Sequence, residues 1–103
     1  MKRMDRILSL LSLSAKGRNL VSGEFMAEKA IKEGTAKVVI VSEDASENTK
    51  KHFRDMCTYR EIPVFFYATK EELGKAIGRE MRASLAVTDA GMAANIIGHL
   101  EER

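Results

Sequence analysis

The segment Lys37–Ser42 constrains the fold of this chain more than any other feature. Its sequence, K-V-V-I-V-S, contains four consecutive β-branched residues, so a strand formed here has no polar face. Strands of this kind lie at the centre of sheets that helices cover on both sides. We therefore expect a buried central strand at this position.

The rest of the chain alternates between strand and helix patterns. Further strands are predicted at residues 20–21, 64–67 and 84–88. Apolar side chains spaced three and four residues apart predict helices at 5–15, 23–33, from the 43–46 turn to about residue 60, at 69–78 and at 90–101. Strands separated by helices indicate an α/β protein, a three-layer α/β/α sandwich around a four-stranded mixed sheet, with residues 1–103 forming a single domain.

Several residues are predicted to begin or end these helices. Gly17 suits the left-handed position after the first helix, and Ser22 suits the N-cap of the second. Thr69 and Glu72 match a capping box, and Asp89 is expected to cap the last helix. The inward-facing helix positions are predicted to be Met4, Ile7, Leu8, Leu11, Ala15, Phe53, Met56, Cys57, Leu73, Ala76, Ile77, Met92, Ala93, Ile96, Ile97 and Leu100.

Composition limits the class of protein. Hydrophobic residues make up 45% of the 103 residues and charged residues 31%, which excludes disordered and low-complexity proteins. No apolar run approaches the roughly 18 residues of a membrane span, and the N-terminus lacks a signal-peptide cleavage pattern. A lone cysteine, Cys57, allows no internal disulfide, favours a reducing cytoplasm and is expected to be buried and inert.

Signs of catalysis are weak. The chain has no glycine-rich phosphate loop of the familiar kinds, and His52 and His99 lie on different predicted helices without metal-ligand spacing. Glu43 and Asp44 follow a buried strand, where α/β proteins place ligands, but turn formation and helix capping explain them better. We therefore expect no enzymatic activity, no cofactor, no metal and no small-molecule substrate.

The N-terminal part of the chain carries the excess of positive charge. Residues 1–37 hold eight basic and four acidic side chains, a net charge of +4, whereas the remainder has a net charge of −2. Lys16 and Arg18 precede a helix start at Gly23, and Lys29 lies less than two turns into that helix. Cations and helix N-termini both attract phosphate oxygens, so this segment indicates a phosphate-binding surface; a mixed solvated surface explains the charge alone equally well.

Three stretches of the chain resemble a known family. They are Leu20–Phe25 (L-V-S-G-E-F) with Lys29-Ala-Ile, Ala36–Ser46 (A-K-V-V-I-V-S-E-D-A-S), and Ile62-Pro-Val with Thr69–Gly78 (T-K-E-E-L-G-K-A-I-G). Together they are similar to the ribosomal-protein superfamily that binds kink-turn RNA, the L-seven-A-e and L-thirty-e type, and most to its bacterial YlxQ subgroup. The resemblance implies an α/β/α sandwich and a non-enzymatic, cytoplasmic RNA-binding function. It also implies structured RNA and ribosomal or translation-related proteins as partners.

The resemblance further implies where RNA would be contacted. In the family, the loop entering the second helix and the first turns of that helix enter the RNA groove through a Gly-x-Asn-Glu-x-x-Lys motif. A second loop, before the fourth strand, packs on bulged nucleotides. The candidate RNA-binding residues of this chain are Lys16, Arg18, Ser22, Gly23, Glu24, Phe25, Met26, Lys29, Arg79, Met81 and Arg82.

Phe25 and Met26 stand where the family motif has Asn and Glu. They lack the groups that hydrogen-bond to sheared G·A pairs, so we expect weakened kink-turn specificity. Phe25 either stacks on an unpaired base or packs as a hydrophobic staple at the helix start, and the sequence favours neither. Two other functions stay open: a protein-interaction adaptor on the same fold, and a small enzyme or receiver-like domain that uses Glu43 and Asp44.

Overall fold

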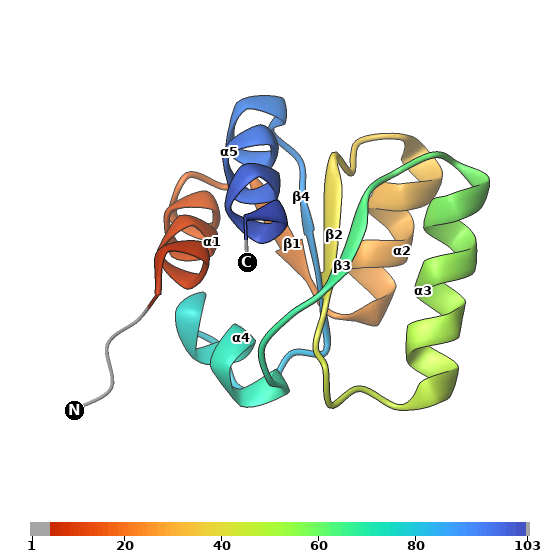
Figure 1. Cartoon of the computed structure of the whole chain (residues 1–103), viewed down its shortest axis with the longest axis horizontal. Helices are drawn as coiled ribbons and strands as arrows, with labels where there is room; N and C mark the ends of the chain where they lie inside the picture. The colour runs from red at the N-terminus through yellow and green to blue at the C-terminus, as the bar shows by residue number, and fades with distance from the viewer. Residues whose placement is uncertain (1–4, 103) are drawn as a thin grey trace.

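The computed structural model of the chain describes residues 5–102 as alternating helices and strands (Figure 1). The helices are α1 (Arg6–Lys16), α2 (Glu24–Glu33), α3 (Glu47–Tyr59), α4 (Lys70–Ala76) and α5 (Ala90–Glu101). The strands are β1 (Leu20–Ser22), β2 (Val38–Val41), β3 (Val64–Phe66) and β4 (Ser84–Val87). Every predicted element is present, with ends that differ from the prediction by at most two residues. Met4, predicted to face the core from the first helix, lies outside the described residues.

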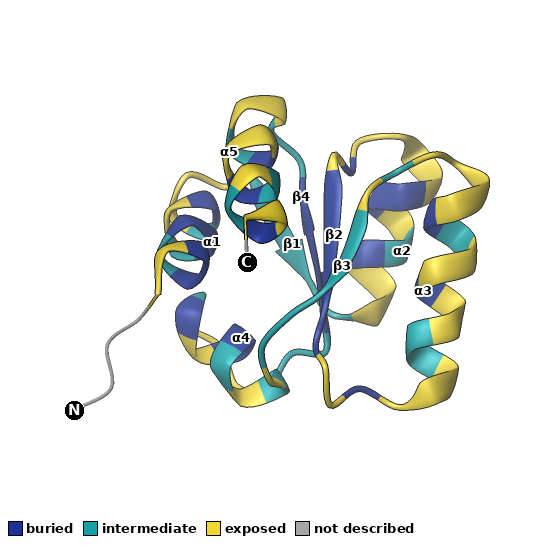
Figure 2. Ribbon diagram, in the orientation of Figure 1, coloured by how far each residue is buried: buried dark blue, intermediate teal, exposed yellow. Residues whose placement is uncertain are grey.

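The strands form one mixed sheet in the order β1-β4-β2-β3. β2 and β3 run parallel, whereas β4 runs antiparallel to both of its neighbours. This confirms the mixed sheet and adds the strand order, which the sequence does not predict. The two central strands are buried along their whole length, and the two outer strands are half-buried (Figure 2).

Helices cover both faces of the sheet, as predicted (Figure 1). Val38 and Ile40 of β2 pack in a cluster with α1, α4 and α5 on one face. Val39 and Val41 pack in a second cluster with α2 and α3 on the other face. Because strand side chains alternate between the two faces, the unbroken apolar run of β2 supplies both cores.

The second core also encloses the thiol. Cys57 and Phe53, both on α3, are fully buried there. Burial raises the pKa of the Cys57 thiol to about 11, so the thiol stays protonated near neutral pH and is a poor nucleophile. The predicted burial of Cys57 is confirmed, and the raised pKa is consistent with an inert thiol.

The structure corrects two predictions at helix ends. α1 extends to Lys16, so Gly17 is its C-cap with a φ of −85°, and Arg18 takes the left-handed position with a φ of 61°. Ser22 does not cap α2, because it is paired in β1 and Gly23 occupies the N-cap position instead. The predicted caps at Thr69 and Asp89 form as expected. Asp5 also caps a helix, α1, although the sequence pattern does not predict it.

Five of the predicted core positions are only partly buried, and one of them is Ala15. The other four pack against one of the two buried clusters rather than within it. These four residues are Met56, Ile77, Met92 and Ile97.

Candidate functional site

The beginning of α2 and the loop that precedes β4 lie at the same edge of the sheet, the one where β1 and β2 end and β4 begins. Ser22, the last residue of β1, pairs with Leu85, and Val41, the last residue of β2, pairs with Ser84. The first residues of β4 therefore lie between the ends of its two neighbours. The Gly23 N–H donates a 2.9 Å hydrogen bond to the Ser84 carbonyl, which fixes the start of α2 against the start of β4.

The N-terminus of α2 differs from the other helix N-termini of residues 5–102. α1, α3, α4 and α5 each have an N-cap side chain that accepts a hydrogen bond from a first-turn N–H, namely Asp5, Ser46, Thr69 and Asp89. The N-cap of α2 is Gly23, which has no side chain to accept such a bond and has a φ of 93° that favours glycine. The first-turn N–H groups of α2 can therefore bind an external acceptor, such as an anion.

Two apolar side chains project from this helix start. Phe25 is 76% exposed and Met26 is 40% exposed. The exposure of Phe25 contradicts the alternative in which it packs as a hydrophobic staple. It lines a shallow surface hollow with Glu28, Lys29 and other residues of α2.

Met26 lines a different hollow from Phe25. This hollow lies between β1, the start of α2 and the residues after α4, and Ser22, Ile77 and Arg79 also line it. Met26 and Phe25 thus offer apolar surface on two adjacent sides of the helix start.

The loop before β4 is fastened on both of its sides. The Arg79 N–H donates to the Gly74 carbonyl at 2.8 Å, and the Arg82 N–H donates to the Lys70 carbonyl at 3.0 Å, which ties the loop to α4. Arg82 Nε donates to Ser22 Oγ at 3.2 Å, which ties the loop to the end of β1. Arg82 therefore holds the loop in place as well as supplying charge, and Met81 next to it is 59% exposed.

Gly74 allows this loop to approach α4, a role that sequence reasoning missed. A Cβ at position 74 would lie 1.7 Å from the Glu80 carbonyl oxygen and 3.1 Å from Met81 Cα. Only a residue without a side chain fits there. The signal in the sequence was a glycine within a helical pattern, which costs about 1 kcal/mol relative to Ala and points to close packing.

Lys16 and Arg18 lie farther from the helix start than the sequence suggested. β1 separates them from Gly23, and its antiparallel register places Leu20 opposite Val87 at the other end of β4. Lys16 lines a hollow between the ends of α1 and α4, together with Lys75, which sequence reasoning did not select. Ala15 and Ile77 line both this hollow and the one that holds Met26, so the two hollows adjoin. Arg18 is exposed and lines neither.

The acidic residues near this edge have other partners. Glu24 lies within 4.8 Å of Glu28 and His52 on the side of α2 that faces α3. Asp44 Oδ1 accepts a 2.9 Å hydrogen bond from the Lys70 N–H at the start of α4. Loss of solvation opposes ionisation of the exposed Asp44 carboxyl, but this hydrogen bond and the Lys70 charge hold its pKa below the usual value. Asp44 thus acts in capping, as predicted, although the helix it supports is α4 rather than α3.

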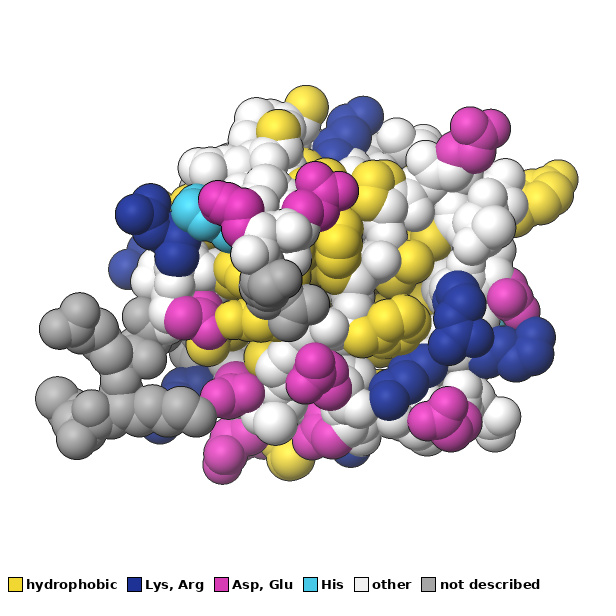
Figure 3. All heavy atoms as spheres, in the orientation of Figure 1, with side chains coloured by type: hydrophobic (Ala, Val, Ile, Leu, Met, Phe, Trp, Pro, Cys, Tyr) yellow, Lys and Arg dark blue, Asp and Glu magenta, His cyan; other side chains and the backbone are white. Residues whose placement is uncertain are grey.

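The face in front of β3 is unlike the start of α2. Figure 3 shows apolar atoms over the sheet edge, Lys and Arg side chains beside α3, and acidic side chains gathered around α4. Glu43, Asp44 and Glu71 are among the exposed acidic residues of that region. Phosphate groups are therefore expected to avoid the outer side of α4.

Residues 5–97 match the model of the ribosomal protein L7Ae/L30e/S12e/Gadd45 family. The chain belongs to this family. It is 41% identical over 92 residues to the RNA-binding protein YlxQ of Bacillus subtilis (strain 168), which covers 89% of this chain and 92% of that protein. It is also 30% identical over 95 residues to the large ribosomal subunit protein eL8 of Cenarchaeum symbiosum (strain A), covering 91% and 75% of the two chains.

Two solved structures share the fold of this chain. A protein of unknown function from Bacillus halodurans superposes with a TM-score of 0.92 at 37% identity, covering 95% of this chain and 99% of that one. The Giardia lamblia 15.5kD RNA binding protein superposes with a TM-score of 0.79 at 22% identity, covering 97% and 92%, a likeness of fold alone. None of the helices within residues 5–102 has the length and apolar character needed to span a bilayer.

Proposed function

We propose that this chain is a non-enzymatic RNA-binding protein that contacts structured RNA with the start of α2 and the loop before β4. The observation that carries the proposal is the composition of that edge. An N-terminus without a side-chain cap, two exposed apolar side chains and the arginines of the fastened loop lie together there. Membership of a family whose members include proteins named as RNA-binding supports it.

Each part of this edge suits a different part of an RNA. The first-turn N–H groups of α2, with Lys29, Arg79 and Arg82, suit phosphate oxygens. Phe25 and Met26 suit unstacked bases, since base stacking on an exposed aromatic ring contributes about 1–3 kcal/mol per base. RNA loops and bulges offer both features together, whereas duplex DNA keeps its bases stacked.

Kink-turn recognition is proposed in a weakened form. Asn and Glu side chains, which the family motif places at positions 25 and 26, are replaced here by Phe25 and Met26. These side chains cannot accept or donate hydrogen bonds at the edges of sheared G·A pairs. The protein would then recognise the shape and the unstacked bases of its RNA more than the G·A pairs themselves.

The wider setting of the protein follows from the same proposal. We place it in the cytoplasm as a single RNA-binding domain, near the ribosome or another structured RNA, with ribosomal or translation-related proteins as further partners. Lys16 and Lys75 would extend the phosphate contacts beyond the helix start, along the two adjoining hollows, and the exposed Arg18 would add a contact outside them.

The experiment is an RNA titration over a range of salt concentrations with three double variants of equal charge. Lys29→Ala with Arg79→Ala tests the helix start, because neither side chain fastens the loop as Arg82 does. Lys16→Ala with Arg18→Ala tests the residues before β1. Lys37→Ala with Arg60→Ala is the control, since these exposed residues precede β2 and follow α3 at the opposite ends of those elements from the site.

The expected result is weaker binding of a hairpin RNA that carries a bulge beside tandem sheared G·A pairs. The slope of log K against log salt should become shallower by about 0.7–0.9 per phosphate contact removed, for the first double variant most of all. Circular dichroism should show an unchanged fold. Equal affinities for the first double variant and the control would refute the proposed face. No salt-dependent RNA binding by the unmodified protein would favour a protein-interaction adaptor instead.

A further inference from the structure

We propose that Glu24, Glu28 and His52 form a binding site for a divalent transition-metal ion, Zn²⁺ or an ion of similar chemistry. The site lies between α2 and α3 and does not depend on the RNA-binding proposal.

The three side chains converge from two helices. Glu24 and Glu28 lie one turn apart on α2, and His52 approaches them from α3. One ligand atom from each residue lies within 4.8 Å of the other two, and His52 Nε2 is 3.2 Å from Glu28 Oε2. Residues 5–102 contain no other such group of three His, Cys, Asp or Glu side chains.

Packing restricts the His52 ring. It meets the Phe53 ring edge to face, with centroids 5.3 Å apart and an interplanar angle of 72°. Phe53 is fully buried, so its ring is a fixed surface for the imidazole. The Glu28 side chain is only 25% exposed. Two of the three ligand side chains are thus already restricted, so binding of an ion costs them little conformational entropy.

The donor set favours Zn²⁺ over Mg²⁺. Open zinc sites have three protein ligands, drawn from His, Cys and carboxylate side chains, and a remaining position for water. Mg²⁺ and Ca²⁺ prefer all-oxygen coordination, and the imidazole nitrogen is a ligand that Zn²⁺ binds well. The imidazole therefore provides the selectivity, and the carboxylates provide the charge.

The net negative charge of the three side chains favours binding of a dication. With His52 neutral, the three side chains carry two negative charges. Lys32 Nζ lies 4.0 Å from Glu28 Oε1, at the limit of an ion pair, and its side chain is 61% exposed. A bound ion would replace this loose contact and the contact of His52 with Glu28, with His52 binding through Nε2 and keeping its proton on Nδ1.

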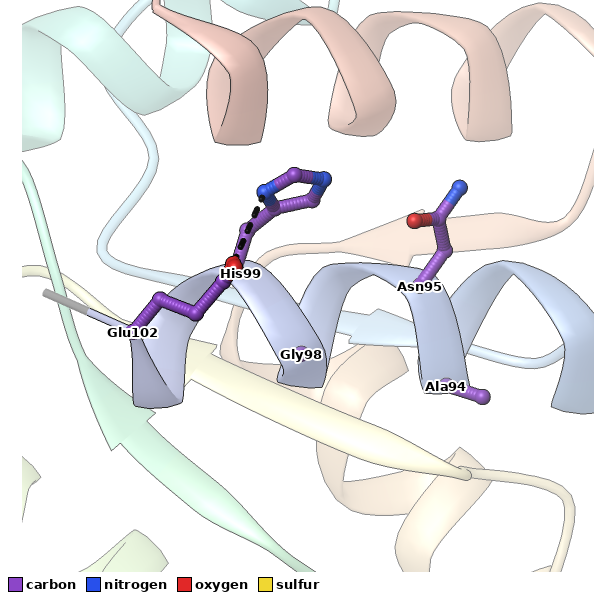
Figure 4. Close-up of a pocket in the computed structure, with 5 residues that line it drawn as sticks. All are labelled: Ala94, Asn95, Gly98, His99 and Glu102. Atoms are coloured by element: carbon purple, nitrogen blue, oxygen red, sulfur yellow. Dashed lines mark ion pairs between the residues drawn. The ribbon is translucent and has the colours of Figure 1, made fainter.

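His99 offers an internal control on α5 (Figure 4). His99 Nδ1 lies 3.9 Å from Glu102 Oε2, so it also has a carboxylate neighbour. The other residues of its pocket are Ala94, Asn95 and Gly98, which supply no second carboxylate. Loss of His99 should therefore leave a specific Zn²⁺ site intact.

The experiment is a calorimetric titration of the full chain, prepared without an affinity tag, with Zn²⁺ and then with Mg²⁺. The variants are His52→Ala and Glu28→Gln, and the control is His99→Ala. We expect one Zn²⁺ per chain for the unmodified protein and the control, and a loss of affinity of about tenfold or more for each site variant. Mg²⁺ in excess should not displace Zn²⁺.

A second measurement separates a lost ligand from a lost fold. The thermal midpoint without metal should be similar for His52→Ala and the unmodified protein, because the His52 side chain is 42% exposed. With Zn²⁺, the midpoint should rise for the unmodified protein and the control only. Equal Zn²⁺ affinity in His52→Ala, dependence on His99 instead, equal competition by Mg²⁺ or no Zn²⁺ binding would each overturn the proposal. RNA affinity measured without metal reports separately on the proposed function.

Discussion

Replacing Gly74 with Ala should displace the loop before β4, which we propose contacts RNA, while leaving the fold in place. The added Cβ would lie 1.7 Å from the Glu80 carbonyl oxygen and 2.5 Å from its carbon. Ordinary contacts begin at 3.4 Å, so the loop backbone must withdraw by about 1.7 Å. Both partners in this clash are backbone atoms, which cannot move aside by a change of rotamer. The strain therefore falls on the loop as a whole.

The balance of energies predicts a net loss of stability. Ala is favoured over Gly within a helix by up to about 1 kcal/mol. Overpacking costs about 1–3 kcal/mol, and each backbone hydrogen bond that is lost costs about 0.5–1.5 kcal/mol. The bonds at risk are those from Arg79 to Gly74 and from Arg82 to Lys70. We expect Gly74→Ala to be less stable by about 1–3 kcal/mol.

RNA binding should weaken together with the stability of the fold. Withdrawal of the loop breaks the alignment of Arg79 and Arg82 with the start of α2. A hydrogen bond to a charged group contributes about 1.5–3 kcal/mol, so losing one phosphate contact lowers affinity by about tenfold or more. The assay is RNA titration together with denaturant unfolding of the same samples. Amide chemical shifts should change at residues 79–83 and at Ser22, and little elsewhere.

Gly98→Ala is the matched control for this substitution. Gly98 also lies within a helix, α5, and a Cβ there would meet no heavy atom within 4 Å. Only the helix-propensity gain remains, so this variant should be more stable by up to about 1 kcal/mol, with RNA affinity unchanged. Unchanged stability and unchanged RNA affinity in Gly74→Ala would refute the argument that Gly74 positions the loop.

Two further predictions concern the recognition of G·A pairs and the buried thiol. Phe25→Asn with Met26→Glu should raise discrimination between an RNA with tandem sheared G·A pairs and one with Watson–Crick pairs there by about 1–3 kcal/mol, by analogy with bidentate base readout. Strong discrimination by the unmodified protein in the same titrations would contradict the reasoning. Cys57→Ser should cost about 1–3 kcal/mol in urea unfolding through a buried unpaired hydroxyl, with RNA affinity unchanged. Because burial raises the pKa of the Cys57 thiol from 9.0 to about 11, its contribution to stability is present below pH 9.0 and lost as the pH rises to about 11. Rapid alkylation of the native thiol would contradict its burial.

The architecture could be predicted because local patterns determine it. The run Val38–Val41 has no polar face, so it required helices on both sides, and they are present. The capping box at Thr69 and Glu72 is also local, and both of its hydrogen bonds form. The left-handed residue after α1 was misplaced by one position because α1 runs one residue longer than its apolar stripe.

The details of the site could be predicted less well, because they depend on contacts between distant segments. Ser22 was expected to cap α2, but its hydroxyl accepts a hydrogen bond from Arg82, sixty residues later in the chain. Glu24 and His52 meet only because α2 and α3 pack side by side. Spacing along a single segment contains no information on either contact.

The direction of β4 explains why the segments of the candidate site meet at this edge. β4 lies between β1 and β2 and runs antiparallel to both, so its first residue lies beside the last residues of β1 and β2. The loop that leads into β4 therefore meets the start of α2 directly after β1. If β4 ran parallel to its neighbours, the same loop would lie at the opposite edge of the sheet, and Arg82 would be a strand length away from Ser22. The antiparallel pairing of the two central strands thus brings the loop to the start of α2. Gly74 then allows the loop to lie close to α4, and the Arg82–Ser22 hydrogen bond holds it at the end of β1.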